Sequence, residues 1–149
     1  MDSTFSFEKA EDSSGFLLWQ VTNLWQREIK KALVAFDLTH SQYVLMASIH
    51  WLSLHGVEVT QIVLSSHTKI DPMTTSTVLR SLQSRGLVDR HEHATDTRAK
   101  TVALSEKGKI LVKDAVIAVE QFDAAFFSPL GADANTFNKK LISLLDFPQ

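Results

Sequence analysis

The stretch HATDTRAKTVALSEKG, residues 93–108, decides the fold, and it places Asp96 and Arg98 two residues apart at a bend. The run Leu87–His93 before the bend alternates weakly between apolar and polar residues, and Thr101–Leu104 after it can pair with that run as an antiparallel strand. The pattern therefore predicts a β-hairpin with Arg98 near its tip. A charged pair on a loop is by itself most often solvated surface, so its meaning depends on the neighbouring segments.

A helix-turn-helix pattern precedes this hairpin. We expect a short helix from Thr60 to about Ser66, a polar turn over residues 67–70, and a second helix that opens with Asp71 and Pro72. Asp71 can accept a hydrogen bond from a free backbone amide, and Pro72 lacks the N–H that the first helical position leaves unpaired. Helix, turn, helix and hairpin in this order predict a winged helix.

The second helix of this pair has two unlike faces. Its inward face is predicted to comprise Thr75, Val78, Leu79 and Leu82. Its outward face carries small hydroxyls, a methionine and an arginine, namely Met73, Thr74, Ser76, Thr77 and Arg80. Exposed helices usually carry Glu and Lys instead. Side chains of this kind can approach bases and phosphates closely, because no carboxylate among them repels the DNA backbone.

Longer helices are expected on the N-terminal side of this unit. One should cover residues 15–36, where apolar residues recur at helical spacing and Ser13 or Ser14 can cap the first turn. Thr39 and Gln42 have capping-box spacing and predict the start of a second helix, which should end near residue 55.

Further helices are expected on the C-terminal side. Ser105 can cap a long helix, and a last one should follow Gly131. The apolar face of the long helix comprises Leu111, Val112, Ala115, Val116, Val119, Phe122 and Phe126. Because this face is too wide for one small lobe to cover, we expect a second copy of the chain to cover it in a homodimer. The alternative is a monomer that folds these helices onto itself.

Charge is distributed unevenly along the 149 residues, whose total net charge is −2. Residues 1–59 carry a net charge of −3, residues 60–113 carry +4, and residues 114–149 carry −3. A basic middle segment between acidic flanks suggests a surface that faces a polyanion, although chance clustering on a solvated surface would look the same. The lack of cysteine excludes disulfides and thiolate metal sites. A polar, acidic N-terminus and the absence of a run of eighteen apolar residues predict a cytoplasmic protein without membrane association.

Four short motifs follow one another along the chain: Leu38-Thr39-x-x-Gln42-Tyr43, Leu79-x-x-Leu82-x-x-x-Gly86-Leu87-Val88-x-Arg90, Asp96-x-Arg98 and Leu104-Ser105-x-x-Gly108. Their order and spacing, rather than any one of them, resemble the MarR family of bacterial transcriptional regulators over roughly residues 15–146. The resemblance implies a mainly α fold with a small β-wing in a single chain of residues 1–149. A winged helix-turn-helix lobe would cover residues 38–104, and a helical dimerisation region would cover residues 13–37 and 105–147.

The resemblance also implies a sequence-specific regulator of double-stranded DNA, most simply a repressor, at a pseudo-palindromic operator. In proteins similar to this one the wing arginine enters a minor groove and the aspartate two residues before it orients it, roles that fall to Arg98 and Asp96. The helix that begins at Asp71 would lie in the major groove. The candidate DNA-binding residues are Ser65, Ser66, His67, Lys69, Met73, Thr74, Ser76, Thr77, Arg80, Asp96, Arg98 and Lys100.

Many members of this family release DNA when a small aromatic or phenolic anion binds between the dimerisation helices and the lobe. By analogy the candidate pocket residues are Phe16, Trp19, Arg27, Tyr43, His50 and Trp51, with Lys31 as a further anion partner. Aromatic residues at helical spacing are more often core than pocket, and this alternative stays open. His91 and His93 would share a strand face, but no carboxylate cluster accompanies them, so neither a metal nor a cofactor is expected.

The sequence has five glycines and no Gly-x-Gly array, and it contains no nucleophile elbow or phosphate-binding loop. We therefore do not expect an enzyme. The alternative to a DNA-binding regulator is a winged helix that docks a protein and does not bind DNA, because a fold does not determine function.

Overall fold

The computed structural model describes residues 2–92 and 100–148, apart from the side chain of Glu92. This part of the chain is mainly helical with one small antiparallel sheet, as the sequence predicts. Its elements are α1 (Ser14–Leu33), α2 (His40–Leu54), α3 (Gln61–Thr68), α4 (Pro72–Ser84), β1 (Val88–Glu92), β2 (Lys100–Leu104), α5 (Glu106–Phe126) and α6 (Ala134–Leu145). Short 3₁₀ turns occur at Ala10–Asp12, Val34–Phe36 and Ser128–Asp133.

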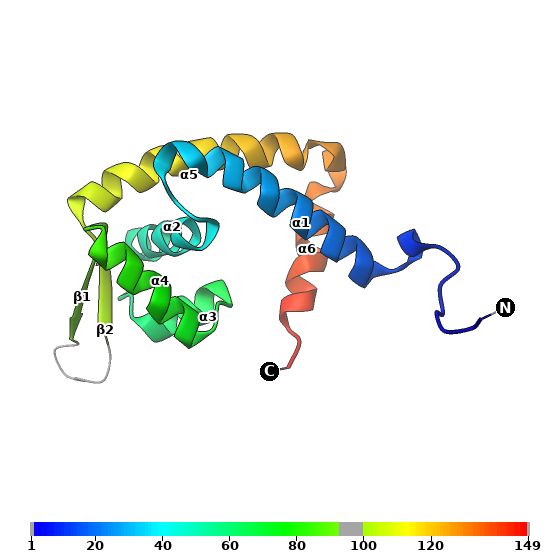
Figure 1. The fold of residues 1–149 in the computed structure, drawn as a ribbon, viewed down its shortest axis with the longest axis horizontal. Helices are drawn as coiled ribbons and strands as arrows, with labels where there is room; N and C mark the ends of the chain where they lie inside the picture. Colours follow the sequence, from blue (N-terminus) through cyan, green and yellow to red (C-terminus); the bar gives the residue numbers. More distant parts are fainter. Residues whose placement is uncertain (1, 93–99, 149) are drawn as a thin grey trace.

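Figure 1 shows how these elements are arranged. The long helices α1 and α5 lie side by side along the top, and a lobe made of α2, α3, α4, β1 and β2 lies beneath one end of them. Helix α6 descends from the other end of α5, away from the lobe. The lobe therefore has one open side, on which α3, α4 and the sheet face outward.

Local hydrogen bonds explain where the helices begin. The hydroxyl of Ser13 accepts the Phe16 N–H at 3.2 Å, and that of Ser105 accepts the Gly108 N–H at 3.0 Å. At the start of α2 both halves of the capping box form, because Thr39 Oγ1 accepts the Gln42 N–H and Gln42 Oε1 accepts the Thr39 N–H. These predicted starts are confirmed.

The core lies where the C-terminal half of α1, α2 and the first half of α5 meet the inward faces of α3 and α4. Its large side chains that are less than 2% exposed include Ile29, Leu33, Leu45, Met46, Ile49, Leu64, Leu79, Leu82, Leu87 and Val112. The buried part of α1 begins only at Ile29. As a result the N-terminal half of α1 projects beyond the lobe with its apolar side chains exposed.

The sheet is a two-stranded hairpin that is attached to the lobe at its base. Val88 pairs with Leu104 at the base of the hairpin, and Glu92 pairs with Lys100 at the far end of the described strands. The chain just before α3 extends the base, since the Val102 N–H donates to the Val59 carbonyl at 2.9 Å. Val102 and Leu104 are buried, whereas Lys100 and Ala103 are exposed.

The expectation that a second copy of the chain covers the apolar face of α5 is wrong for three of its residues. Val112, Ala115 and Val119 are at most 4% exposed, because α1 and α2 of the same chain cover them. No second subunit is needed for this part of the face. The unpartnered apolar surface instead lies at the start of α1 and on α6, where Leu18, Trp19 and Leu144 are more than half exposed.

None of the helices within residues 2–92 and 100–148 combines the length and the apolar character that a membrane span requires.

Candidate nucleic-acid interface

The turn between α3 and α4 determines how the outward helix is presented. Lys69 ends α3 in the left-handed region with φ at 65°, and Asp71 caps α4 by accepting the Thr74 N–H at 2.8 Å and the Thr74 hydroxyl at 2.7 Å. The Thr74 backbone bond, followed by the Thr74 hydroxyl bond, holds the pKa of the Asp71 carboxyl below its usual value. Helix α3 is longer than expected and includes His67 and Thr68, because the Lys69 N–H still donates to the Ser65 carbonyl at 3.0 Å.

Helix α4 separates a buried face from an exposed one, as the sequence predicts. Thr75, Leu79 and Leu82 are fully buried, and the Thr75 hydroxyl donates to the Asp71 carbonyl at 2.9 Å. On the other side Met73 is 79% exposed, and Thr74, Thr77 and Arg80 are exposed as well. Ser76 is half-buried at the edge of this face.

A short chain of hydrogen bonds orders the exposed face of α4. Arg80 Nη2 donates to Thr77 Oγ1 at 3.3 Å, and the Thr77 hydroxyl donates to the Met73 carbonyl at 3.1 Å. The guanidinium is held along the helix and stays exposed. Because Pro72–Ser84 contains no Asp or Glu, α4 itself places no negative side chain beside Arg80.

Among the residues predicted at the preceding turn, one is misplaced. Ser65 is only 9% exposed, and its hydroxyl donates to the Ile70 carbonyl at 2.6 Å. It therefore closes the turn from inside and does not face solvent as a phosphate contact would. Ser66, His67 and Lys69 are exposed on the outer side of the same segment.

The hairpin lies beside α3. Arg90 on β1 donates from Nη2 to Gln61 Oε1 at 2.8 Å, which ties the wing to the first turn of α3. This contact was not anticipated from the sequence, because it joins residues 29 positions apart. Lys100 is exposed at the start of β2, whereas Asp96, Arg98 and His93 lie outside the described residues. His91 is exposed on β1.

The six predicted pocket residues do not line one cavity. Tyr43, His50 and Trp51 do share a cavity of about 530 Å³, together with His67 of α3 and Glu120 of α5. Phe16 lines a different hollow beside Phe5 and Phe7. The remaining two, Trp19 and Arg27, are exposed on α1. The half of α1 that carries Phe16 and Trp19 projects away from the lobe, so these two residues lie apart from the cavity at Tyr43.

The surroundings of Tyr43 are unfavourable for negative charge. Burial, followed by the nearby carboxylates of Glu120 and Asp123, raises the pKa of its phenol to about 12. The expected anion partners are not at this cavity either, since Lys31 pairs with Glu28 at 3.0 Å on α1. The described part of the chain contains no group of three His, Asp or Glu side chains arranged to hold a metal.

Together, the helix-turn-helix, the hairpin beside it and the outward face of α4 define a winged helix-turn-helix protein. Residues 34–120 match the family model described as "ArnR1-like, winged-helix domain". The chain is 42% identical over 122 residues to the HTH-type transcriptional regulator YdcH of Bacillus subtilis, which covers 82% of this chain and 83% of YdcH.

Three solved structures extend the likeness beyond the lobe. CouR from Rhodococcus jostii RHA1 bound to p-coumaroyl-CoA has a TM-score of 0.79 at 24% identity, over 96% of this chain and 98% of CouR. A mutant of MarR from E. coli complexed with operator DNA has a TM-score of 0.76 at 22% identity, over 90% of this chain and 93% of that one. A transcriptional regulator of the MarR family from Rhodococcus sp. RHA1 has a TM-score of 0.78 at 25% identity, over 96% of this chain and 99% of that one. With the family model and YdcH, this likeness shows that the chain belongs to the MarR family of winged helix-turn-helix transcriptional regulators. Its relatives are regulators, which confirms that an enzyme is not to be expected.

Proposed function

We propose that the protein is a homodimeric repressor that binds a pseudo-palindromic operator, with α4 in the major groove and Arg98 of the wing in the minor groove. The observation that carries this proposal is the exposed face of α4. Met73, Thr77 and Arg80 are exposed on a helix that contains no Asp or Glu, and the Asp71 carboxylate that precedes the helix is bonded to Thr74. Short hydroxyls and an arginine are donors suited to base edges and phosphates.

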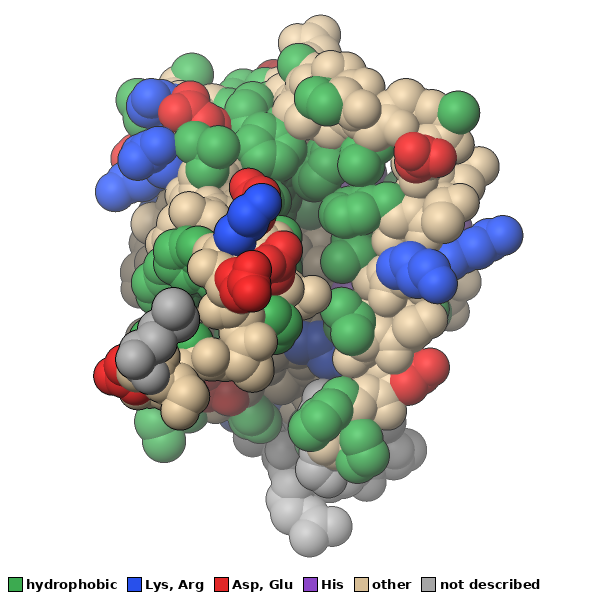
Figure 2. All heavy atoms as spheres, turned by 90° about the vertical axis from the view of Figure 1, so that its right-hand side faces the viewer, with side chains coloured by type: hydrophobic (Ala, Val, Ile, Leu, Met, Phe, Trp, Pro, Cys, Tyr) green, Lys and Arg blue, Asp and Glu red, His purple; other side chains and the backbone are tan. Residues whose placement is uncertain are grey.

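Dimerisation is supported by the apolar surface away from the lobe. Figure 2 faces the side on which α6 and the start of α1 lie, and hydrophobic side chains gather there around a hollow between the two. The exposed apolar residues include Phe16, Leu17, Leu18, Trp19, Val21 and Leu24 on α1, and Leu141, Ile142, Leu144 and Leu145 on α6. A surface of this extent marks a protein interface, and a twofold dimer would place two α4 helices about one turn of duplex apart. Repression is supported by relatives from Mycobacterium that are HTH-type transcriptional repressors and are 26% identical to this chain over 131 residues.

The cavity beside Tyr43 is the candidate effector site. It lies between α2, α5 and His67 at the end of α3, so a ligand there would contact the segment that leads into α4. By analogy with CouR, whose structure holds p-coumaroyl-CoA, we propose an aromatic effector. The carboxylate of Glu120 at the lining and the raised pKa of Tyr43 favour a ligand whose aromatic part in this cavity is neutral.

The test of DNA binding starts from site selection. Wild-type protein would select sequences from a random duplex pool, and affinity for a selected duplex would then be measured by fluorescence anisotropy between about 50 and 200 mM salt. A dimer that neutralises several phosphates should lose affinity by orders of magnitude over this range. Failure to enrich any sequence would favour the alternative of a protein-docking winged helix.

Arg80→Ala tests the exposed face of α4 directly. Because Arg80 is expected on or near the DNA backbone, its loss should weaken binding to all sequences by about 1–3 kcal/mol and reduce the salt slope by about one per subunit. Lys113→Ala is the matched control, since it also removes one positive charge, from an exposed position on α5. Equal effects of the two variants would contradict the proposed face. Arg98→Ala in the same assay tests the wing.

A further inference from the structure

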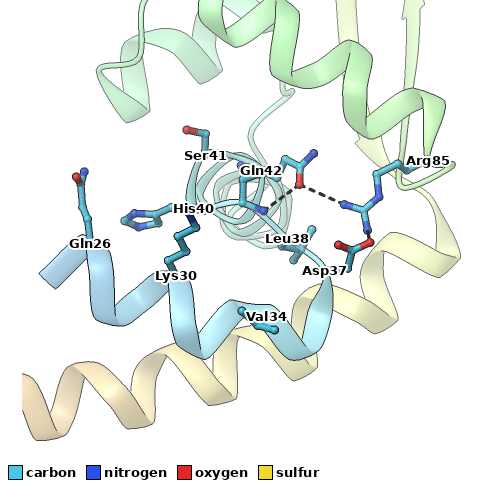
Figure 3. Close-up of a pocket in the computed structure, with 10 residues that line it drawn as sticks. Gln26, Lys30, Val34, Asp37, Leu38, His40, Ser41, Gln42 and Arg85 are labelled. Carbon is cyan, nitrogen blue, oxygen red and sulfur yellow. Dashed lines mark hydrogen bonds and ion pairs between the residues drawn. The ribbon is translucent and has the colours of Figure 1, made fainter. Parts of the chain in front are cut away.

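The side-chain amide of Gln42 lies at the corner where α1 ends, α2 begins and α4 ends (Figure 3). Its Oε1 accepts the backbone N–H of Thr39 at 3.0 Å and Arg85 Nη1 at 3.2 Å. Its Nε2 donates to Ser81 Oγ on α4 at 2.8 Å. One side chain thus connects the start of α2 to two residues at the end of α4.

The orientation of this amide is determined by its partners. Both groups that approach Oε1 are donors, so the NH₂ group must face Ser81, whose hydroxyl oxygen can accept. Gln42 is only 9% exposed. A buried amide with partners on both its oxygen and its nitrogen is costly to displace, because any rearrangement would leave a polar group unpaired.

Arg85 adds a second contact at the same corner. Its Nη2 lies 3.5 Å from Asp37 Oδ2, but the Asp37 side chain is 98% exposed, so this ion pair contributes little. The Arg85 bond to Gln42 is on the inner side of the corner, at the edge of a hollow of about 760 Å³ whose lining also includes Lys30 and His40. Besides the packing of the buried Leu82, the end of α4 is therefore tied to α2 through the hydrogen bonds of Gln42.

The two ends of α4 are held by different means. At its N-terminal end Thr75 is buried and bonded to the Asp71 carbonyl. At its C-terminal end Leu82 is buried, and the residue before it, Ser81, makes the polar contact to Gln42 of α2. Ser81 is one helical turn beyond Thr77 and about two turns beyond Thr74. A change at this end of the helix would tilt the exposed face relative to the rest of the lobe.

We propose that Gln42 is a positioning residue for sequence recognition: its hydrogen bond to Ser81 holds α4 at the angle at which its exposed side chains discriminate between base sequences. Gln42 is buried and does not touch DNA. It acts on specificity, because base contacts require accurate placement whereas phosphate contacts tolerate small displacements. This inference rests on the proposed DNA-binding function.

The experiment compares four single variants and the double variant Gln42→Met/Ser81→Ala in the full-length protein. Gln42→Met removes all three hydrogen bonds of the amide, and Ser81→Ala removes only the contact to α4. Gln42→Glu keeps an acceptor for Thr39 and Arg85 and can accept the Ser81 hydroxyl. Ser84→Ala is the matched control, because Ser84 is an exposed serine in the last turn of the same helix.

For each variant we would measure the affinity for a duplex selected by the wild-type protein and for a scrambled duplex, at one salt concentration and with the active fraction titrated. The ratio of the two affinities should fall about tenfold in Gln42→Met and in Ser81→Ala, the value of about one hydrogen bond. In the double variant Gln42→Met/Ser81→Ala the ratio should fall no further than in Gln42→Met alone. Gln42→Glu and Ser84→Ala should keep the wild-type ratio, and the salt slope should stay unchanged throughout.

The outcomes separate this inference from the function on which it rests. A wild-type protein that selects no sequence would overturn both. A wild-type protein that selects a sequence, with the same ratio in Ser81→Ala as in Ser84→Ala, would overturn the positioning role alone. If Gln42→Met does not fold, Ser81→Ala and Gln42→Glu still decide, because neither disturbs the capping box.

Discussion

Replacing Gly108 by alanine should destabilise the protein, although alanine is the better helix former. A Cβ built on Gly108 in the first turn of α5 would stand 2.1 Å from the Leu87 carbonyl oxygen and 3.1 Å from its carbon. Ordinary van der Waals contact of a Cβ with a neighbouring atom begins at about 3.4 Å, so the Cβ and the carbonyl oxygen would overlap. The Leu87 carbonyl cannot retreat easily, since it accepts the Ser105 N–H at 3.0 Å and Leu87 is 1% exposed.

The magnitude follows from three contributions. Overpacking against a fixed backbone costs about 1–3 kcal/mol. Weakening the Ser105 to Leu87 hydrogen bond costs about 1 kcal/mol, and the helix propensity of alanine over glycine returns about 1 kcal/mol. The net expectation is a loss of about 1–3 kcal/mol of unfolding free energy, measured by urea denaturation at one protein concentration.

Gly15→Ala is the matched control for this prediction. It lies in the first turn of α1, and an added Cβ there meets nothing within 4 Å. Without strain the same substitution should be neutral or stabilise by up to about 1 kcal/mol. A Gly108→Ala protein as stable as the wild type would refute the argument, because it would mean that α5 does not press against the start of β1.

Two further predictions concern stability. Ser105→Ala should cost about 1–2 kcal/mol, because it removes both the cap on Gly108 and the bond to the Gly86 carbonyl at 2.7 Å; Ser53→Ala, exposed on α2, is the urea-denaturation control. Burial lowers the pKa of His40 below 6.5 despite the opposing charge of Asp123, so the unfolded chain binds more protons just below that pH and stability should fall as the pH drops below about 6.5. Denaturation midpoints from pH 5 to 8 should show this slope, and a His40→Gln variant with the wild-type slope would contradict it.

The features that sequence predicted best are those determined by three or four consecutive residues. Thr39, Asp71 and Ser105 were identified as helix caps and Ser13 as one of two candidates with Ser14, and each of the four accepts a backbone N–H in the first turn of its helix. A cap depends on a local hydrogen bond, which the spacing of residue types shows directly. The buried and exposed faces of α4 followed in the same way from helical periodicity.

The errors concern placement between elements. Ser65 was expected on the surface, but in the eight residues of α3 the helical phase is too short to show which polar side chain turns inward. Phe16 and Trp19 were assigned to a pocket because they are aromatic and lie on α1. Nothing in the periodicity of α1 shows that only its C-terminal half packs on the lobe, since the whole helix is amphipathic.

Gln42 shows the same limit of prediction from sequence, because only its local contacts could be predicted. Its role in the capping box was evident from its distance of three residues to Thr39, whereas its bonds to Ser81 and Arg85 join positions 39 and 43 residues apart. A residue with an evident role in local structure can therefore also make tertiary hydrogen bonds that its local pattern does not reveal. In this lobe the consequence is mechanical: the helix whose exposed face contributes nothing to the core takes its orientation from a corner that also ends α1. The hydrogen bonds of Gln42 connect the segment between α1 and α2 to the end of α4, so a displacement of α1, whether from subunit contact or from a ligand, can reach α4 through this corner.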